Sequence, residues 1–114
     1  MPCIQLSTNQ KISGEKEADL KRIFGKLIEL VPGKTERWLM IVFQGGCRMS
    51  FAGDGEKPAA FVKIGLFGKA PKSAYDKLTA ALTDEVSLEL GVEPTRIYIQ
   101  YEESQYWGWN GGNF

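Results

Sequence analysis

The sequence predicts an α+β fold in which two similar β-α-β units form one mixed sheet, with two helices on the same face of that sheet. Apolar residues recur at helical spacing in two segments, and each segment lies between two apolar runs of strand length. The flanking strands of the two halves recur at nearly equal intervals, as Ile4 with Val62 and Trp38 with Tyr98 show. Right-handed crossovers in both units would place both helices on one side of the sheet.

The first unit begins with a β-compatible segment, residues 2–7, and continues into a helix predicted over about 15–31. Ser13 is suited to cap the start of this helix, and Pro32-Gly33 ends it. The apolar run 38–43 is short and glycines follow it, so we expect a strand that is buried on both faces. The helix carries one apolar stripe at the helical repeat: Leu20, Ile23, Phe24, Leu27, Ile28 and Val31.

The segment between the two units predicts a turn, a short strand and a loop. Gly45-Gly46 begins the turn, and Arg48 to Phe51 has the residues of a short strand. The stretch from Gly53-Asp54-Gly55 to Pro58 is typical of a loop, and it lacks the pattern of a phosphate-binding loop.

The second unit repeats the order of the first. Residues 59–67 are predicted to form a strand, and Ser73 with Asp76 resembles a capping box that begins a helix ending at Gly91. Residues 96–102 alternate between two faces, as expected of a half-buried strand. The predicted helix carries an apolar ridge: Tyr75, Leu78, Leu82 and Val86.

The chain has 114 residues, of which 43% are apolar and 25% charged, the composition of a soluble globular domain. We therefore expect one domain over residues 1–114, with pseudo-repeats of about 2–44 and 59–103 and an aromatic C-terminal tail over 104–114. Basic and acidic residues number 14 each, and this balance argues against a nucleic-acid partner.

Histidine is absent, which excludes histidine bases, histidine-containing triads and histidine metal ligands. Cys3 and Cys47 have no metal-binding spacing, and we expect two small buried residues in a reducing compartment, although a single bridge between them stays open. No segment is long and apolar enough to span a bilayer, and no secretory signal is visible, so the expected location is cytoplasmic. Secretion by a non-classical route leaves no such mark and stays open.

The predicted sheet requires cover on its second face. The 38–43 run predicts apolar residues on both faces, whereas two helices cover only one. A large exposed apolar face is rare in a soluble monomer, so we expect a homo-oligomer.

Two residues could carry chemistry at the amino-terminal end. If Met1 is removed, Pro2 becomes the terminal residue with a secondary amine, and burial or a nearby cation lowers the pKa of such an amine. A neutral amine at pH 7 is a competent general base. Lys34 is suited either to bind a substrate carboxylate or to complement the end of the preceding helix. Taken alone, both residues are more often ordinary ones.

Short motifs in a specific order extend over essentially the whole chain. They are Met1-Pro2, Gly33-Lys34, Met49-Ser50-Phe51-Ala52-Gly53, Phe67-Gly68-Lys69, Arg96-Ile97-Tyr98-Ile99, Trp107-Gly108-Trp109-Asn110 and Asn113-Phe114. Together they resemble the macrophage migration inhibitory factor (MIF) branch of the tautomerase superfamily.

This resemblance implies a homotrimer whose sheets line a central channel and whose active sites lie between adjacent subunits. It implies keto–enol tautomerisation of phenylpyruvate-like α-keto acids, an isomerase reaction that needs no cofactor. Pro2 would be the catalytic base, and Lys34 would bind the carboxylate or the adjacent carbonyl oxygen of the substrate.

The resemblance also implies a set of substrate-binding residues. The backbone amide of Phe67 lies where the family has an isoleucine, and the bulkier side chain would narrow the pocket. Tyr98 matches a pocket tyrosine from the neighbouring subunit, and Gln100 replaces a usual asparagine with a longer amide. The implied aromatic wall comprises Trp38, Trp107 and Phe114.

The sequence departs from the mammalian cytokine members, which carry a CxxC where this chain has Ala59-Ala60-Phe61-Val62. A thiol oxidoreductase activity is therefore unsupported. Two alternatives to the tautomerase stay open: a cytokine-like protein that binds a receptor, with a vestigial or secondary pocket, and a D-dopachrome tautomerase/decarboxylase.

Overall fold

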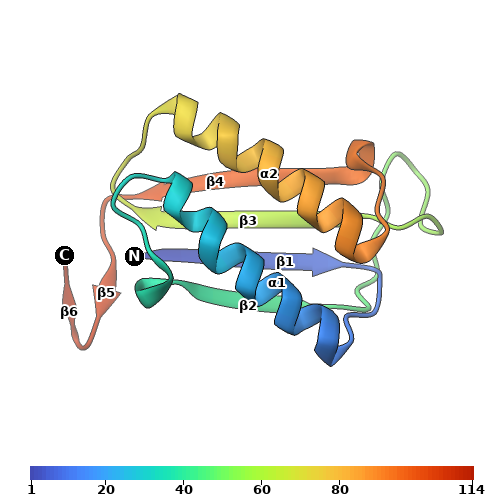
Figure 1. Ribbon diagram of the computed structural model, residues 1–114, viewed down its shortest axis with the longest axis horizontal. Helices are drawn as coiled ribbons and strands as arrows, with labels where there is room; N and C mark the ends of the chain where they lie inside the picture. The colour runs from blue at the N-terminus through green and yellow to red at the C-terminus, as the bar shows by residue number, and fades with distance from the viewer.

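The two β-α-β units lie side by side in a computed structural model that describes residues 1–114 (Figure 1). Both helices cross one face of a four-stranded sheet with the strand order β2-β1-β3-β4. A separate two-stranded hairpin lies beyond one end of the sheet, close to the amino terminus. The elements are β1 (Pro2–Thr8), α1 (Gly14–Leu27), η1 (Ile28–Leu30), η2 (Glu36–Trp38), β2 (Met40–Gln44), β3 (Ala60–Phe67), α2 (Lys72–Leu90), η3 (Pro94–Arg96), β4 (Ile97–Ser104), β5 (Gly108–Trp109) and β6 (Gly112–Asn113).

The sheet is mixed, and its two units meet at the centre. Within the units, β1 runs parallel to β2 and β3 runs parallel to β4. The central strands β1 and β3 are antiparallel, with Ile4 opposite Ile64 and Pro2 opposite Leu66. The predicted α+β class, with two β-α-β units and both helices on one face, is confirmed.

The first helix begins where the sequence predicts. The Ser13 side chain accepts a hydrogen bond from the backbone N–H of Lys16, the expected N-cap interaction. The α-helix ends at Leu27 and tightens into the 3₁₀ turn η1, so the predicted extent to Val31 is slightly too long. Val31 is nevertheless buried at the end of the predicted stripe.

The predicted capping box of the second helix is wrong. The helix begins at Lys72 with Pro71 in the N-cap position, where no side chain caps it, and Ser73 is already helical. Pro71 has the extended backbone of an N-cap, so the first turn forms directly after it and needs no serine cap. Asp76 instead pairs with Lys72 one turn earlier, at 2.8 Å. Gly91 ends the helix in the left-handed conformation, with φ at 66°.

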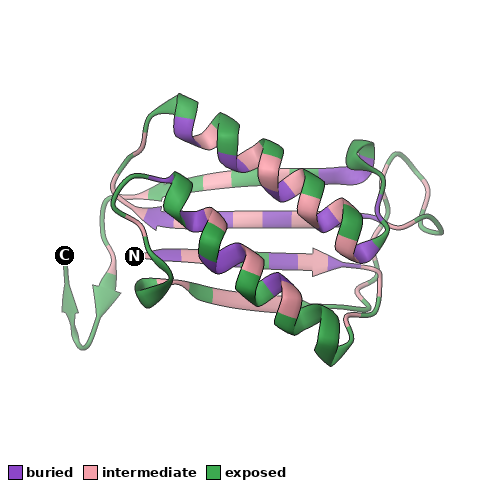
Figure 2. Cartoon of the chain, in the orientation of Figure 1, coloured by how far each residue is buried: buried purple, intermediate pink, exposed green.

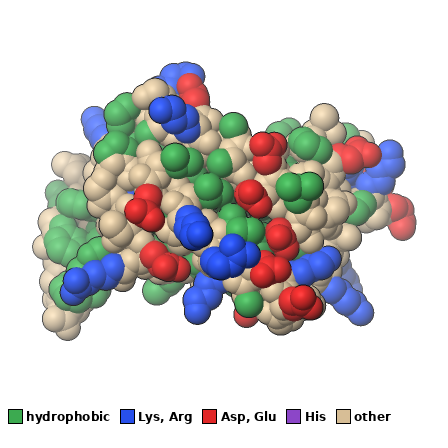
Figure 3. All heavy atoms as spheres, in the orientation of Figure 1, with side chains coloured by type: hydrophobic (Ala, Val, Ile, Leu, Met, Phe, Trp, Pro, Cys, Tyr) green, Lys and Arg blue, Asp and Glu red, His purple; other side chains and the backbone are tan.

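The core lies between the two helices and the sheet. The inward-facing stripes of α1 and α2 are buried against alternate residues of the central strands (Figure 2). Figure 3 shows that the outer, helix-bearing side of the molecule carries charged groups of both signs. The fully buried side chains of largest volume include Phe24, Ile4, Leu6, Leu20, Ile28, Ile64, Leu66, Leu78 and Leu82.

The second face of the sheet is not covered within this chain. The prediction that the 38–43 strand is buried on both faces is wrong: Met40 is 64% exposed, and Ile41 and Phe43 are only half-buried where they pack toward the core. This face is also less apolar than predicted, because Gln5, Lys63 and Gln100 lie opposite one another across three strands. Lys63 additionally pairs with Glu102 on β4, at 2.9 Å.

The linker between β2 and β3 contains no extended strand. Arg48 to Phe51 was predicted as one, but only Phe51 pairs, and it pairs with Asp54 in a tight turn. Ala52 and Gly53 both have positive φ, which reverses the chain within this turn. The loop predicted from Gly53 onward is confirmed. No helix of the structure is long and apolar enough to cross a membrane.

Two leucines of α2 should differ in how much they contribute to the free energy of unfolding. Leu82 is fully buried, whereas Leu88 is 79% exposed on the same helix. We expect Leu82→Ala to lower the free energy of unfolding by about 2–5 kcal/mol, because the truncation removes buried methyl groups and leaves a cavity that the surrounding core fills only in part. Leu88→Ala should change it by less than about 0.5 kcal/mol. Urea unfolding at one fixed protein concentration measures both, and similar losses would contradict the assigned core.

Candidate active site

Three segments that are distant in the sequence meet at the amino-terminal end of β1. Pro2 is buried as the first residue of that strand. The backbone N–H of Phe67, at the end of β3, donates to the carbonyl oxygen of Met1 at 3.1 Å. The Nζ atom of Lys34 donates to the Phe67 carbonyl oxygen at 3.0 Å. The Lys34 side chain therefore lies beside the amino terminus of the chain and does not serve only to complement the end of α1.

The position of Lys34 follows from local backbone chemistry. The 3₁₀ turn η1 ends at Leu30, and Gly33 adopts a positive φ of 78°, a conformation that residues with a side chain rarely adopt. The Lys34 N–H then bonds to the Val31 carbonyl at 3.1 Å and closes the turn. This reversal directs the Lys34 side chain away from α1 and toward β3.

The amino terminus has the electrostatic environment of a base. Burial, the positive charge of Lys34 and a hydrogen bond with Lys34 all hold the pKa of the Met1 amine below its usual value of 8.0, with burial contributing most. Each influence disfavours the protonated, charged form. An amine at this place is therefore neutral at lower pH than an ordinary chain terminus.

An aromatic cavity of about 360 Å³ adjoins the terminus. The Trp38 and Trp109 rings meet edge to face at 5.3 Å, and Trp109 stacks on Phe114 at 6.4 Å. Phe114 also contacts Phe67, with ring centres 5.6 Å apart. Figure 3 shows hydrophobic side chains gathered at this end of the molecule, around the β5–β6 hairpin. Every residue that lines the cavity is apolar: Met1, Trp38, Phe67, Trp109 and Phe114.

Met1 occupies the place where the other groups converge. Its side chain lines the aromatic cavity, its carbonyl holds the Phe67 N–H, and its peptide bond ties up the Pro2 nitrogen. Removal of Met1 would leave three groups at one point: a secondary amine, a free backbone donor and the Lys34 ammonium. That set suits a substrate that must lose a proton while negative charge forms on its oxygen.

Within one chain, the structure brings together only part of the predicted aromatic wall. Trp38 and Phe114 lie in it as predicted, but Trp107 lies on the uncovered sheet face, where its ring is near Gly65. Trp109, which the sequence analysis did not select, lines the cavity beside Trp38. Both tryptophans belong to the same aromatic tail, and their spacing alone does not say which ring the hairpin turns toward Trp38.

Tyr98 and Gln100 do not join the other predicted residues within one chain. Pro2 lies opposite Leu66 on β3, whereas Tyr98 lies beside Phe61. Along β3 these two positions are about 16 Å apart, at the usual strand rise of about 3.3 Å per residue. Gln100 lies between them in register with Lys63. Both residues are exposed on the uncovered face of the sheet.

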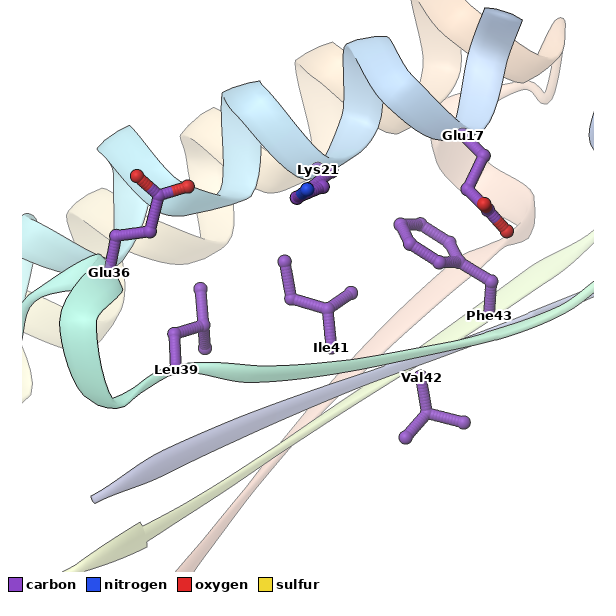
Figure 4. A pocket seen from close by; sticks show the side chains of 7 residues that line it. All are labelled: Glu17, Lys21, Glu36, Leu39, Ile41, Val42 and Phe43. Carbon is purple, nitrogen blue, oxygen red and sulfur yellow. The ribbon is translucent and has the colours of Figure 1, made fainter. Parts of the chain in front are cut away.

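The largest cavity, about 830 Å³, lies elsewhere, between α1 and the edge strand β2. Figure 4 shows Leu39, Ile41 and Phe43 pointing toward α1, while Val42 points to the opposite side of the strand. Glu17, Lys21 and Glu36 complete its lining. None of the predicted site residues lies there, so its size does not make it the reaction site.

The sulfur and carboxylate groups of the chain form no metal site. No cluster of three or more Cys, Asp or Glu side chains could hold a metal ion. Cys3 and Cys47 are free and partly exposed, so the prediction that both are buried is wrong. Cys3 lies on the uncovered sheet face because side chains alternate along β1.

Known proteins share this fold and sequence over their full lengths. The family model described as macrophage migration inhibitory factor (MIF) matches residues 1–114. A macrophage migration inhibitory factor homolog of Trichuris trichiura is 31% identical over 100% of both chains. The crystal structure of Leishmania major MIF2 has a TM-score of 0.93 and 30% identity, covering 100% of this chain and 97% of that one.

A bacterial relative has a similar structure. The macrophage migration inhibitory factor homologue from Prochlorococcus marinus has a TM-score of 0.86 and 29% identity over 98% of each chain. MIF proteins are generally homo-oligomeric, and their fold suggests isomerase activity. With a family match over every residue and the same sheet and helices, the chain belongs to the macrophage migration inhibitory factor family.

Proposed function

We propose that this protein is a cofactor-independent tautomerase that interconverts the keto and enol forms of phenylpyruvate-like α-keto acids. The observation that carries the proposal is the convergence of the partly buried amino terminus with Lys34 and an aromatic cavity. The amine would act as the general base, and the Lys34 ammonium would bind the carboxylate or carbonyl oxygen of the substrate. The aromatic cavity would bind the aryl ring.

The reaction would proceed by two proton transfers at one amine. With Met1 removed, the neutral Pro2 nitrogen takes a proton from the carbon next to the ketone, and the C–H electron pair forms the enolate double bond. Negative charge then rests on the former ketone oxygen, near the Lys34 ammonium and the freed Phe67 N–H. The protonated amine returns its proton to that oxygen and gives the enol, so no atoms or electrons are gained or lost.

We further propose that the complete pocket forms between subunits of a homotrimer. Tyr98 and Gln100 lie too far along the sheet to reach Pro2 of their own chain. Both lie on the face that the helices leave open, where a second copy can approach. In this assembly, Tyr98 and Gln100 of one subunit line the pocket that Pro2 begins in its neighbour.

The names of the relatives support a second proposal, a cytokine-like role through a receptor. Several of them are called macrophage migration inhibitory factor homologs. Receptor binding to the outer surface would not require the Pro2 amine. A protein that binds a receptor but shows no tautomerase activity would therefore favour this function over the tautomerase.

The first test replaces the base. Pro2→Gly should lower phenylpyruvate tautomerisation by about 100-fold, the usual contribution of a general base, because glycine lacks the ring that fixes the amine against the sheet. In the parent protein, kcat/KM should rise with pH, because the amine must lose its proton to act. The midpoint should lie below the pKa of a solvent-exposed terminal proline, since burial and Lys34 disfavour a charged amine here, as they do for the Met1 amine.

Mass spectrometry of the parent protein supplies the necessary control. It must show that Met1 has been removed, because a retained Met1 leaves no free amine on Pro2. A protein that starts at Pro2 and shows no tautomerisation would overturn the proposed activity. An activity that is unchanged by Pro2→Gly would overturn the assigned base.

The second test removes the counter-charge. Lys34→Gln should raise KM for phenylpyruvate by about tenfold, the loss expected for one charge-assisted hydrogen bond. It should also move the midpoint of the pH profile upward, because the Lys34 charge no longer lowers the pKa of the amine. Lys77→Gln is the matched control, since Lys77 is exposed on α2 and does not contribute to the lowered pKa of the terminal amine. Equal kinetics for Lys34→Gln and Lys77→Gln would remove Lys34 from the site.

A further inference from the structure

Arg96 is a buried charge that forms no ion pair. Only 7% of the residue is exposed, yet its guanidinium forms no ion pair with a carboxylate. It donates instead to four backbone carbonyl oxygens of the linker between β2 and β3. These are the carbonyls of Pro58 at 2.8 Å, Phe51 at 3.2 Å, Asp54 at 3.1 Å and Lys57 at 3.1 Å.

These bonds fix the shape of the linker loop. A buried guanidinium is costly unless its donors are satisfied, so the loop carbonyls must stay directed at Arg96. The loop is closed from within by Asp54, whose carboxylate accepts from the backbone N–H groups of Glu56 and Lys57 at 2.8 and 3.3 Å. Asn9 holds the far end of the loop through Lys57 and Ala59.

The same guanidinium also fixes an aromatic contact. Its central carbon lies 5.3 Å from the centre of the Phe51 ring, while the Phe51 carbonyl accepts one of its hydrogen bonds. The Phe51 ring in turn meets Tyr98 at 68° with ring centres 5.1 Å apart. The Tyr98 side chain is 64% exposed and forms no hydrogen bond within the chain, so Phe51 is its principal restraint.

We propose that Arg96 is a positioning residue that sets the orientation of Tyr98 through Phe51. The inference rests on the proposed function, in which Tyr98 lines the pocket of a neighbouring subunit. Arg96 then lies outside the reacting groups and touches no substrate. Arg96 would affect the affinity for substrate. If Tyr98 loses its restraint, its side chain must be ordered when substrate binds, and this ordering costs binding free energy.

Arg96→Lys is the most direct variant to test this role. Lysine keeps the charge but cannot donate along the several directions of a guanidinium, so the loop carbonyls are only partly satisfied. We expect KM for phenylpyruvate to rise by about tenfold while kcat changes by less than about twofold, the pattern of lost binding without lost chemistry. The midpoint of the pH profile should not move, because the Pro2 amine is unaffected.

Phe51→Leu tests the proposed route. If Arg96 acts through Phe51, the double variant should have the KM of the more impaired single variant, since both changes release the same ring. Multiplied effects in the double variant would show that Arg96 acts by another route and would overturn the proposal.

Two control variants separate positioning from general stability. Arg48→Lys makes the same chemical change at an exposed arginine of the same linker and should leave KM unchanged. Asn9→Ala loosens the far end of the loop without touching Phe51. If Asn9→Ala lowers Tm by as much as Arg96→Lys does, it should still change KM by less than about twofold. A rise as large as that of Arg96→Lys would make Arg96 a structural residue only.

An NMR measurement gives a result whether or not the protein is an enzyme. The Phe51 ring displaces the ring-proton resonances of Tyr98, and Arg96→Lys and Phe51→Leu should both return them toward values for free tyrosine. Unchanged Tyr98 resonances in folded Arg96→Lys would overturn the proposal. Displaced resonances in an inactive parent protein, lost in the variant, would keep the positioning role and reject only the tautomerase.

Discussion

The antiparallel pairing of β1 with β3 is the constraint on which the candidate site depends. It places the start of β1 beside the end of β3, so Pro2 lies opposite Leu66 and next to Phe67. A parallel pairing would instead place the amine beside the start of β3, at the opposite end of that strand from Phe67. Proline is tolerated here because the first residue of a strand need not donate to the sheet. The fold thus puts a chain terminus, which is usually solvated, against a packed sheet.

The chemistry of the terminus follows from the same packing. Burial lowers the pKa of an amine, and it also brings Lys34 close enough to lower that pKa further. The turn at Gly33 is what allows Lys34 to reach β3, since the left-handed backbone there reverses the chain. Lys34 and the terminal amine are therefore positioned by two separate backbone features: the turn at Gly33 and the pairing of β1 with β3.

The sequence predicted the elements that depend on repeating patterns. Both helices and β4 follow from apolar periodicity, and β2 follows from a short apolar run. Ser13 and Gly91 mark helix ends because a side-chain cap and a left-handed glycine act locally. The predictions fail where contacts with distant parts of the chain, and not local residue preferences, determine the structure. Arg48 to Phe51 has strand-forming residues, but Arg96 draws the neighbouring carbonyls into a loop. Trp107 and Trp109 were separable only by the hairpin, whose two short strands carry no periodic signal.

The uncovered sheet face connects the two ends of the molecule. Its middle carries Gln5, Lys63 and Gln100, so an approaching copy meets polar groups and not a continuous apolar surface. Such a face favours a defined register over maximal burial, because each polar group must find a partner. The ends of the face are built differently. Backbone pairing holds the amine end, whereas one buried arginine holds the loop that supports Tyr98. A pocket between two subunits would have one wall from the amine end and one from the Tyr98 end. Because each wall is held by different contacts, a substitution that displaces either one would weaken substrate binding.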